Sequence, residues 1–325
     1  MTVVPSPRSV PLGLVVVAMA VVYVVWGSTY LGIRIVVEEA DPLTAMGVRY
    51  AAAGLLLGAA LAMRSGWHRL RVTPRELVGA GILGLLLPLL GNGVVAVAES
   101  RGLTSGYAAL LIAIAPLAIV VFRSVEHDRP SAATLVGVLT GFGGLAILVV
   151  LGREGEGIRL LPAVLGLMAG TFWAFGSYIQ PRLWLPKDAF VIAVYEMLLG
   201  GLMLLASGLL AGEEITLDHS ARVWTAWVYL VVFGSVVAFS AYVWLVANVR
   251  ISLVATYAYV NPVIAVLLGW LVLGETITWT TAIGGLVVVG SVAVVIRSER
   301  RTPPPVEATV EETDIPPLPD KDSQP

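Results

Sequence analysis

Long apolar runs, separated by short polar stretches, occupy the chain from about residue 12 to residue 297. A helix needs about 20 apolar residues to cross roughly 30 Å of hydrocarbon. The pattern therefore predicts an all-α integral membrane protein with ten transmembrane helices. The predicted spans are 12–36, 43–63, 76–98, 103–122, 133–151, 160–180, 189–210, 222–246, 252–273 and 279–297.

Prominent residues recur at a nearly constant interval along the chain. The recurring pairs are Trp26 with Trp173, Arg49 with Glu196, Gly137 with Gly284 and Gly143 with Gly290, each 147 residues apart, and Pro116 with Pro262, 146 apart. Each unit contains five predicted helices, so the second unit would enter the membrane in the opposite orientation. Inverted repeats of this kind let many secondary transporters expose one site to either side in turn.

The repeat and the flanking composition divide the chain into four segments. Residues 1–11 form an N-terminal segment, 12–151 the first five-helix repeat and 152–297 the second, inverted repeat. Residues 298–325 are rich in proline and acidic side chains. Because such a stretch buries too little apolar surface to offset its ordering entropy, we expect a disordered tail.

Composition supports the membrane class. Hydrophobic residues make up 58% and charged residues 13% of the chain, and the mean hydropathy is +0.89. Soluble domains carry about 25% charged residues. The net charge of -2 gives no support to a nucleic-acid partner, and the absence of cysteine excludes disulfides and thiolate metal sites.

The distribution of lysine and arginine predicts the orientation, because positively charged loops stay in the cytoplasm. The loops on the side of the N-terminus, together with both ends of the chain next to the spans, hold 13 basic residues, against 4 on the other side. We therefore expect a multi-pass protein of the cell (inner) membrane with both termini in the cytoplasm.

Motifs that would indicate other functions do not occur in the sequence. The chain contains no G-x-x-x-x-G-K-[ST] loop, no G-x-S-x-G elbow, no H-E-x-x-H motif and no aspartate within a predicted span. We therefore expect no enzymatic activity, no cofactor, no metal and no direct use of ATP. The spans are also too apolar for a polar-lined channel.

Four ionisable residues in or next to the predicted spans are candidates, because a charged side chain in the membrane costs about 2.5–3.5 kcal/mol or more unless it is paired or hydrated. Arg49 and Glu196 lie about two turns into their spans, at equivalent positions of the two repeats, and Arg34 and Glu99 lie nearer the surface. One interpretation makes these residues gating or coupling groups, with Arg49 binding a carboxylate and Glu196 carrying a proton. The alternative is that each is an anchor whose charged head reaches the interface.

Uncharged polar and aromatic residues near mid-span form a second set of candidates: Trp26, Asn92, Trp173, Tyr257 and Asn261. A buried polar group in a membrane needs a partner of some kind. These residues are predicted to bind substrate in a central cavity, or else to support helix packing.

Two prolines occupy span interiors, Pro116 in the fourth span and Pro262 in the ninth. A proline in a helix frees the carbonyl four residues earlier, here those of Ile112 and Ala258. We expect a helix break at each proline.

Several stretches carry a resemblance to a known family. They are residues 26–34, 48–54, 91–99, 104–116, 251–262 and 273–275, together with the glycine-patterned last helix. In this order, in both halves and over residues 12–297, they resemble the drug/metabolite transporter superfamily in its EamA-type branch. The first half departs from the pattern, since residues 125–127 read Val-Glu-His where residues 273–275 read Leu-Gly-Glu.

The resemblance implies a ten-helix carrier that moves a small metabolite, amino acid or drug, usually outward, by alternating access. Its expected partners are a small-molecule substrate and the lipid bilayer. Coupling to protons, an uncoupled facilitator, and a lipid flippase or accessory membrane subunit stay open as alternatives, as do monomer and homodimer.

Overall fold

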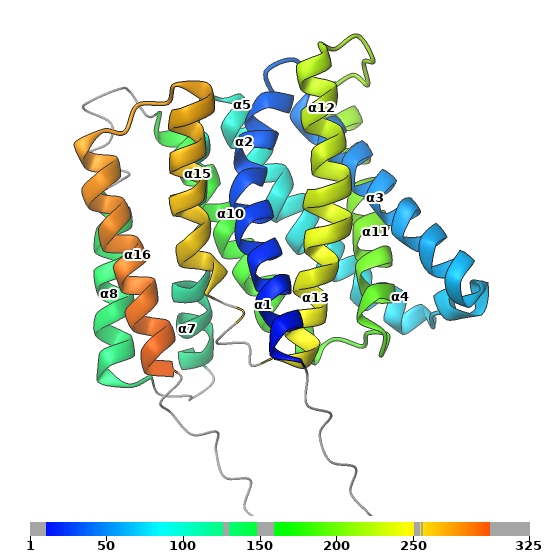
Figure 1. The fold of residues 1–325 in the computed structure, drawn as a ribbon, viewed down its shortest axis with the longest axis horizontal. Coiled ribbons are helices and arrows are strands. Elements are labelled where there is room, and N and C mark those ends of the chain that lie inside the picture. The colour runs from blue at the N-terminus through cyan, green and yellow to red at the C-terminus, as the bar shows by residue number, and fades with distance from the viewer. Residues whose placement is uncertain (1–10, 126–129, 148–158, 250–253, 255, 300–325) are drawn as a thin grey trace, which may run out of the picture.

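The protein folds as a bundle of helices that run side by side along one direction (Figure 1). The structure, a computed structural model, describes residues 11–125, 130–147, 159–249, 254 and 256–299. The α-helices are α1 Leu12–Val21, α2 Gly27–Val36, α3 Pro42–Ser65, α4 Pro74–Gly84, α5 Val94–Ser100, α6 Ser105–Ile112, α7 Ala115–Val125, α8 Ala132–Ala146, α10 Leu160–Ile179, α11 Ala189–Leu210, α12 Ala221–Tyr229, α13 Ala238–Asn248, α15 Tyr257–Leu273 and α16 Trp279–Glu299.

Three π-helical segments join some of these helices into longer ones: Val22–Trp26, Leu85–Gly93 and Leu230–Val237. Two short 3₁₀ segments, Trp67–Leu70 and Gln180–Arg182, follow α3 and α10. All regular elements within the described ranges are helical, which confirms the all-α prediction there.

Seven helices in the described part of the chain are long and apolar enough to cross a membrane. They are Leu12–Val36, Pro42–Ser65, Pro74–Ser100, Ser105–Val125, Leu160–Arg182, Ala189–Leu210 and Ala221–Leu245. Shorter apolar helices, Ala132–Ala146, Val260–Leu273 and Trp279–Val295, lie where the fifth, ninth and tenth spans were expected. The count of ten spans and the inverted repeat stay predictions.

Some expectations fall outside the described residues. These concern most of the N-terminal segment, residues 1–10, most of the expected disordered tail, residues 300–325, and the boundary between the repeats at 151 and 152.

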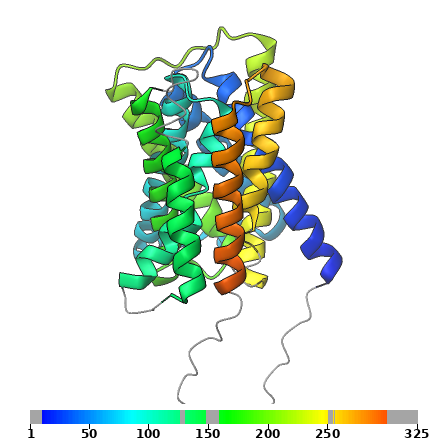
Figure 2. The same cartoon turned by 90° about the vertical axis from the view of Figure 1, so that its left-hand side faces the viewer.

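The two ends of the bundle differ in which loops they carry (Figures 1 and 2). The upper end in Figure 1 carries the connections 37–41, 101–104, 211–220 and 274–278. At the lower end α1 begins and α16 ends, and the connections 66–73 and 183–188 lie there. We use the names upper end and lower end for these two groups of loops.

Local sequence signals set where the helices begin and end. Thr73 and Glu76 form a capping box at the start of α4, and the Ser131 hydroxyl accepts a hydrogen bond from the Thr134 N–H at the start of α8. Gly274 ends α15 with a φ of 66°, a left-handed conformation that glycine adopts without a steric penalty. These signals make the hairpins short and fix the depth of the residues between them.

Helices from the two halves meet in close backbone contacts. A Cβ at Gly201 of α11 would lie 2.5 Å from the Ala51 nitrogen of α3, and one at Gly47 would lie 2.7 Å from the Leu205 nitrogen. Helices α8 and α16 also pack together, through Gly137 and its neighbours (Figure 2). Small residues let two helix backbones approach this closely. In a membrane the lipid is as apolar as the helix surface, so helices associate through such close packing and not through the hydrophobic effect.

The two interior prolines differ in their effect. Helix α6 ends at Ile112 and α7 begins at Ala115, so the fourth span is interrupted directly before Pro116. Pro262 instead lies inside α15, which runs unbroken from Tyr257 to Leu273. The expected break at Pro262 is therefore wrong, because a proline as the sixth residue of this helix removes one hydrogen bond without ending it.

Candidate functional site

A cavity of about 60 Å³ lies in the centre of the bundle, where helices of both halves meet. The uncharged candidates from the sequence and one of the charged ones all line it: Trp26, Arg49, Asn92, Trp173, Tyr257 and Asn261. Further lining residues come from the fourth and eighth spans, among them Ile112 and Gly234. We call this space the central cavity.

Aromatic rings form the floor of the central cavity, with Trp26 at the centre of the group. The Trp26 ring centroid lies 4.8 Å from that of Tyr242, 5.4 Å from Tyr257, 5.8 Å from Trp173 and 6.2 Å from Phe239. The contacts with Trp173 and Tyr257 are edge-to-face, an arrangement that aromatic pairs favour.

Trp26 is held in place by the eighth span. Its indole Nε1 donates a hydrogen bond of 3.2 Å to the carbonyl of Gly234, which lies in the π-helical segment Leu230–Val237. π-Helical turns often occur at functional sites. Trp26 itself ends another such segment, Val22–Trp26, and Asn92 lies in the third, so all three border the central cavity.

Arg49 is 2% exposed, and its guanidinium has polar but uncharged neighbours. Its Nε donates to the Ser235 hydroxyl at 3.0 Å, its Nη1 lies 3.5 Å from the Met46 sulfur, and its Cζ lies 4.8 Å from the centre of the Tyr50 ring. No carboxylate in the described residues pairs with it. The central cavity therefore carries a buried positive charge.

Asn261 connects two spans at the edge of the same cavity. Its amide lies 3.3 Å from the carbonyl oxygen of Tyr257 and 3.2 Å from that of Tyr23, so the amide nitrogen faces both acceptors. The nitrogen is thus used to join the first and ninth spans. A bond to a substrate would have to come from its oxygen.

Two further cavities lie below the aromatic rings. One of about 510 Å³, the lower cavity, extends toward the lower end and is lined by residues such as Pro116, Ile119 and Ala258. It shares Trp173 and Tyr257 with the central cavity. These two rings therefore separate the small upper space from the large lower one.

Glu196 lies in a separate space of about 190 Å³, together with Lys187, Gln180 and Tyr242. It is 3% exposed, and its Oε1 has no hydrogen-bond partner. No ion pair joins it to Arg49 within the described residues. The two residues at equivalent sequence positions thus line different spaces.

Arg34 and Glu99 meet, but not as an ion pair. Arg34 Nη1 donates a hydrogen bond to the main-chain oxygen of Glu99. The Glu99 side chain is 0% exposed, and both of its carboxyl oxygens lack a hydrogen-bond partner. The interpretation of Glu99 as an anchor that reaches the interface is therefore wrong.

At the upper end, carboxylates of one half cap helix N-termini of the other half. Glu275 Oε1 accepts from the Ser105 N–H at 2.8 Å, and its Oε2 accepts from the Ser105 hydroxyl at 2.9 Å and from the Gly106 N–H at 3.2 Å. Room for this carboxylate comes from Gly269, where a Cβ would lie 2.2 Å from Oε2. The negative charge also suits the positive end of the α6 dipole.

Two more carboxylates act in the same way. Glu213 Oε2 accepts from the Thr44 N–H in the first turn of α3 at 2.8 Å. Glu39 accepts from the N–H and the hydroxyl of Ser220, both at 2.7 Å, at the start of α12. These bonds hold the pKa of the Glu39 carboxyl below its ordinary value, the hydroxyl having the largest effect. We call Glu39, Glu213 and Glu275 the upper-end caps.

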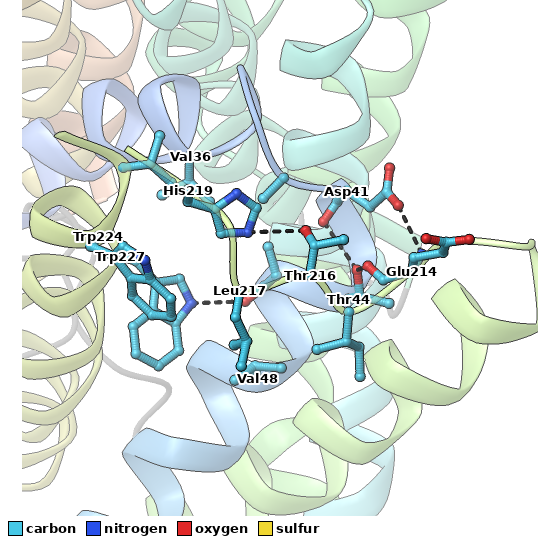
Figure 3. Close-up of a pocket in the computed structure, with 14 residues that line it drawn as sticks. Val36, Asp41, Thr44, Val48, Glu214, Thr216, Leu217, His219, Trp224 and Trp227 are labelled. Carbon is cyan, nitrogen blue, oxygen red and sulfur yellow. Dashed lines mark hydrogen bonds between the residues drawn. The ribbon is translucent and has the colours of Figure 1, made fainter. Parts of the chain in front are cut away.

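An apolar pocket of about 90 Å³ lies between the connections 37–41 and 211–220, which Glu39 and Glu213 help to join (Figure 3). Figure 3 shows the surrounding hydrogen bonds, including one from the Glu214 N–H to Asp41 at 2.8 Å and one between Thr216 and His219 at 3.2 Å. The pocket shares no lining residue with the central cavity. The upper pocket and the central cavity are therefore distinct spaces.

Sequence reasoning missed several residues of the site. Ser235, which binds Arg49, and Gly234, whose carbonyl binds Trp26, lie in a predicted span that also contains Thr225 and Ser240. The sequence therefore offered no signal that set these two residues apart. Among the described residues no group of three or more His, Cys, Asp or Glu could hold a metal ion.

Comparison with known proteins gives consistent matches. The model of the EamA-like transporter family matches the chain twice, over residues 13–150 and 160–297. The chain is 40% identical over 263 residues to the uncharacterized inner membrane transporter YedA of Escherichia coli K12, covering 80% of this chain and 83% of that protein. It is 23% identical to an uncharacterized transporter of Archaeoglobus fulgidus, over 84% and 94% of the two chains.

A solved crystal structure also resembles this one, with a TM-score of 0.62 over 89% of this chain and 99% of the other. The sequence identity is 20%, so the likeness concerns the fold alone.

Proposed function

The chain belongs to the EamA-like transporter family, and from this premise we propose that it is a secondary transporter that exports a small molecule across the inner membrane by alternating access. Membership makes it a membrane transporter with a small-molecule substrate. The mechanism, direction and site are inferences from the geometry.

The observation that carries the proposal is Arg49 in the central cavity. A buried cation without a carboxylate partner is costly in a membrane protein and marks a substrate or ion pathway by default. Here it lies beside Trp26, Asn92, Trp173 and Tyr257, on a cavity to which both halves contribute. Such a position, between two repeats, is where secondary transporters bind their substrate.

The difference between the two ends supports alternating access. The upper-end caps join the halves above the central cavity, whereas the 510 Å³ lower cavity reaches to the rings that border it. We infer that this conformation faces the lower end. Because basic residues concentrate in the loops of that end, we place it in the cytoplasm, with both termini.

Glu196 is the candidate coupling residue. It is buried, one of its oxygens lacks a partner, and it lines a space that holds Lys187 and Gln180 from the lower end. A carboxyl in this position can release its proton to the lower side when substrate binds there, and take up another from the upper side after the substrate has left, so that inward proton movement drives export. The alternative is an uncoupled facilitator, in which Glu196 would carry no coupling proton.

The test uses purified protein in liposomes with a pooled set of metabolites and an imposed pH gradient. We expect gradient-dependent accumulation of a solute. Glu196→Gln should abolish the dependence on the gradient while leaving equilibration of the same solute intact. Glu214→Gln, in a loop at the upper end, is the matched control and should behave as the wild type.

Unchanged gradient dependence in a correctly inserted Glu196→Gln protein would remove the coupling role. Equilibration without accumulation by the wild type would establish the facilitator instead. Movement of no solute at all would contradict transport by this chain alone.

A further inference from the structure

The charge of the central cavity restricts what can bind there. Arg49 contributes a full positive charge, and no aspartate or glutamate is among the described residues that line this cavity. The two buried glutamates of the described spans, Glu99 and Glu196, do not line it, and Glu196 lines a different space. A substrate group that neutralises Arg49 must therefore bring its own negative charge.

The size of the central cavity restricts the same group further. Its volume is about 60 Å³, whereas a cavity that binds benzene measures about 150 Å³. A carboxylate is therefore a better match for this space than an aromatic ring. Asn92 also lines the cavity and offers an amide to the second carboxylate oxygen.

The rest of the substrate has room on the other side of Trp173 and Tyr257. The lower cavity holds about 510 Å³ and is lined mainly by apolar side chains, such as Ala115, Ile119 and Leu185. Its Ser177 hydroxyl already donates to the main-chain oxygen of Trp173. Apolar walls with few free polar groups favour an apolar ligand.

We infer that the substrate is an amphipathic organic anion, with one carboxylate bound at Arg49 and an apolar body that occupies the lower cavity once Trp173 and Tyr257, which contact each other here, move apart. The inference rests on the proposed function, because it assumes that the central cavity is the transport site. A zwitterion is a poorer fit, because an ammonium beside the carboxylate would lie close to Arg49 with no carboxylate to pair with.

Four compounds with the same body separate these charges: 4-phenylbutyrate, 4-phenyl-1-butanol, 4-phenylbutylamine and the zwitterion 2-amino-4-phenylbutyrate. Binding to the purified full chain is measured by calorimetric titration. We expect 4-phenylbutyrate to bind at least tenfold more tightly than the alcohol and the amine, with the zwitterion between them.

Three variants assign the preference to Arg49. Arg49→Gln should reduce the affinity for 4-phenylbutyrate at least tenfold and leave that for the alcohol unchanged. Arg49→Lys keeps the charge and should keep the preference for the acid over the alcohol. Arg64→Gln removes an exposed arginine from the same helix and should change neither affinity.

Equal binding of the acid and the alcohol, binding of none of the four compounds, or full affinity for the acid in Arg49→Gln would overturn the inference. The liposome assay with pooled metabolites distinguishes failure of this inference from failure of the proposed function. If an uncharged or cationic solute accumulates there, the transporter stands and only the substrate class is wrong.

Discussion

The upper and lower ends of the bundle hold the two halves together to different extents. At the upper end, Glu213 and Glu275 of the second half cap helix N-termini of the first half, Glu39 of the first half caps one of the second, and Arg222 forms an ion pair of 2.9 Å with Glu38. At the lower end, the Arg69 guanidinium and the Asp188 carboxylate form an ion pair of 2.7 Å, and a 510 Å³ cavity lies between the helices. We infer from this that a few directional bonds hold the upper end closed and that the lower end is the open one.

This difference indicates which contacts must change during transport. Backbone contacts such as Gly47 with Gly201 cannot open without a large loss of packing. Hydrogen bonds to a carboxylate at the surface can exchange with water. We therefore expect the caps to break and the close helix pairs to persist when the protein turns to face the upper side.

The largest effect should come from Glu275, which makes three hydrogen bonds at the start of α6. Charge-assisted hydrogen bonds contribute about 1.5–3 kcal/mol each and are not additive. Glu275→Ala should weaken the closed upper end by about 2–3 kcal/mol, or roughly 30- to 150-fold in the ratio of closed to open protein.

The wild-type chain contains no cysteine, so a single introduced thiol reports this ratio. Thr29 lines the central cavity, and Thr29→Cys should react with a membrane-impermeant maleimide from the upper side much faster when Glu275→Ala is also present. Equal labelling rates with and without Glu275→Ala would show that this cap does not hold the upper end closed.

A smaller effect is expected at Glu213, which makes one hydrogen bond, to the Thr44 N–H. Glu213→Ala should shift the same ratio by about 1–2 kcal/mol, or roughly 5- to 30-fold. Its neighbour Glu214 is the control, since its side chain makes no hydrogen bond in the described part of the chain. If Glu214→Ala increased Thr29→Cys labelling as much as Glu213→Ala, loop charge and not capping would be responsible.

The contribution of Glu39 to the closed upper end depends on pH. Because the bonds from Ser220 lower the pKa of this carboxyl from about 4.5, its contribution is present above pH 4.5 and is lost as the pH falls through the lowered value. Labelling of Thr29→Cys should therefore not respond to Glu39 between pH 8 and pH 5. Glu39→Gln should increase the labelling of Thr29→Cys already at pH 7, whereas protonation of the native Glu39 should do so only below pH 4.5. An increase in labelling between pH 7 and pH 5 that is absent from the Glu39→Gln protein would contradict the predicted direction of the pH dependence.

The smallest effect is expected at the lower end. The side chains of Arg69 and Asp188 are 28% and 33% exposed, and partly exposed ion pairs contribute about 0–1 kcal/mol. Arg69→Ala should change the labelling of Thr29→Cys less than about fivefold. A change as large as that of Glu275→Ala would mean that both ends are held by comparable forces.

Much of the helical arrangement follows from local sequence signals. The second span was expected at 43–63 and the helix covers Pro42–Ser65, because Pro42 starts it and Gly66 ends it. The five uncharged candidates share one cavity because polar residues within apolar spans avoid lipid and face one another.

Contacts between distant residues were beyond this reasoning. Ser235 was missed as the partner of Arg49 because the π-helical segment that turns it inward depends on packing. The caps were missed for the same reason, since Glu275 and Ser105 lie 170 residues apart. The residues that bind substrate, gate and couple stay predictions until they are measured.

The most direct test of alternating access compares labelling from the two sides of the membrane. Ser177 lines the lower cavity and Thr29 the central cavity, and each is replaced by cysteine in the otherwise unchanged chain. We predict that an impermeant maleimide labels Ser177→Cys in inverted vesicles but not in intact cells, and that Thr29→Cys becomes reactive in intact cells only when Glu275→Ala opens the upper end. Equal labelling of Ser177→Cys from both sides would contradict a cavity that opens to one side at a time.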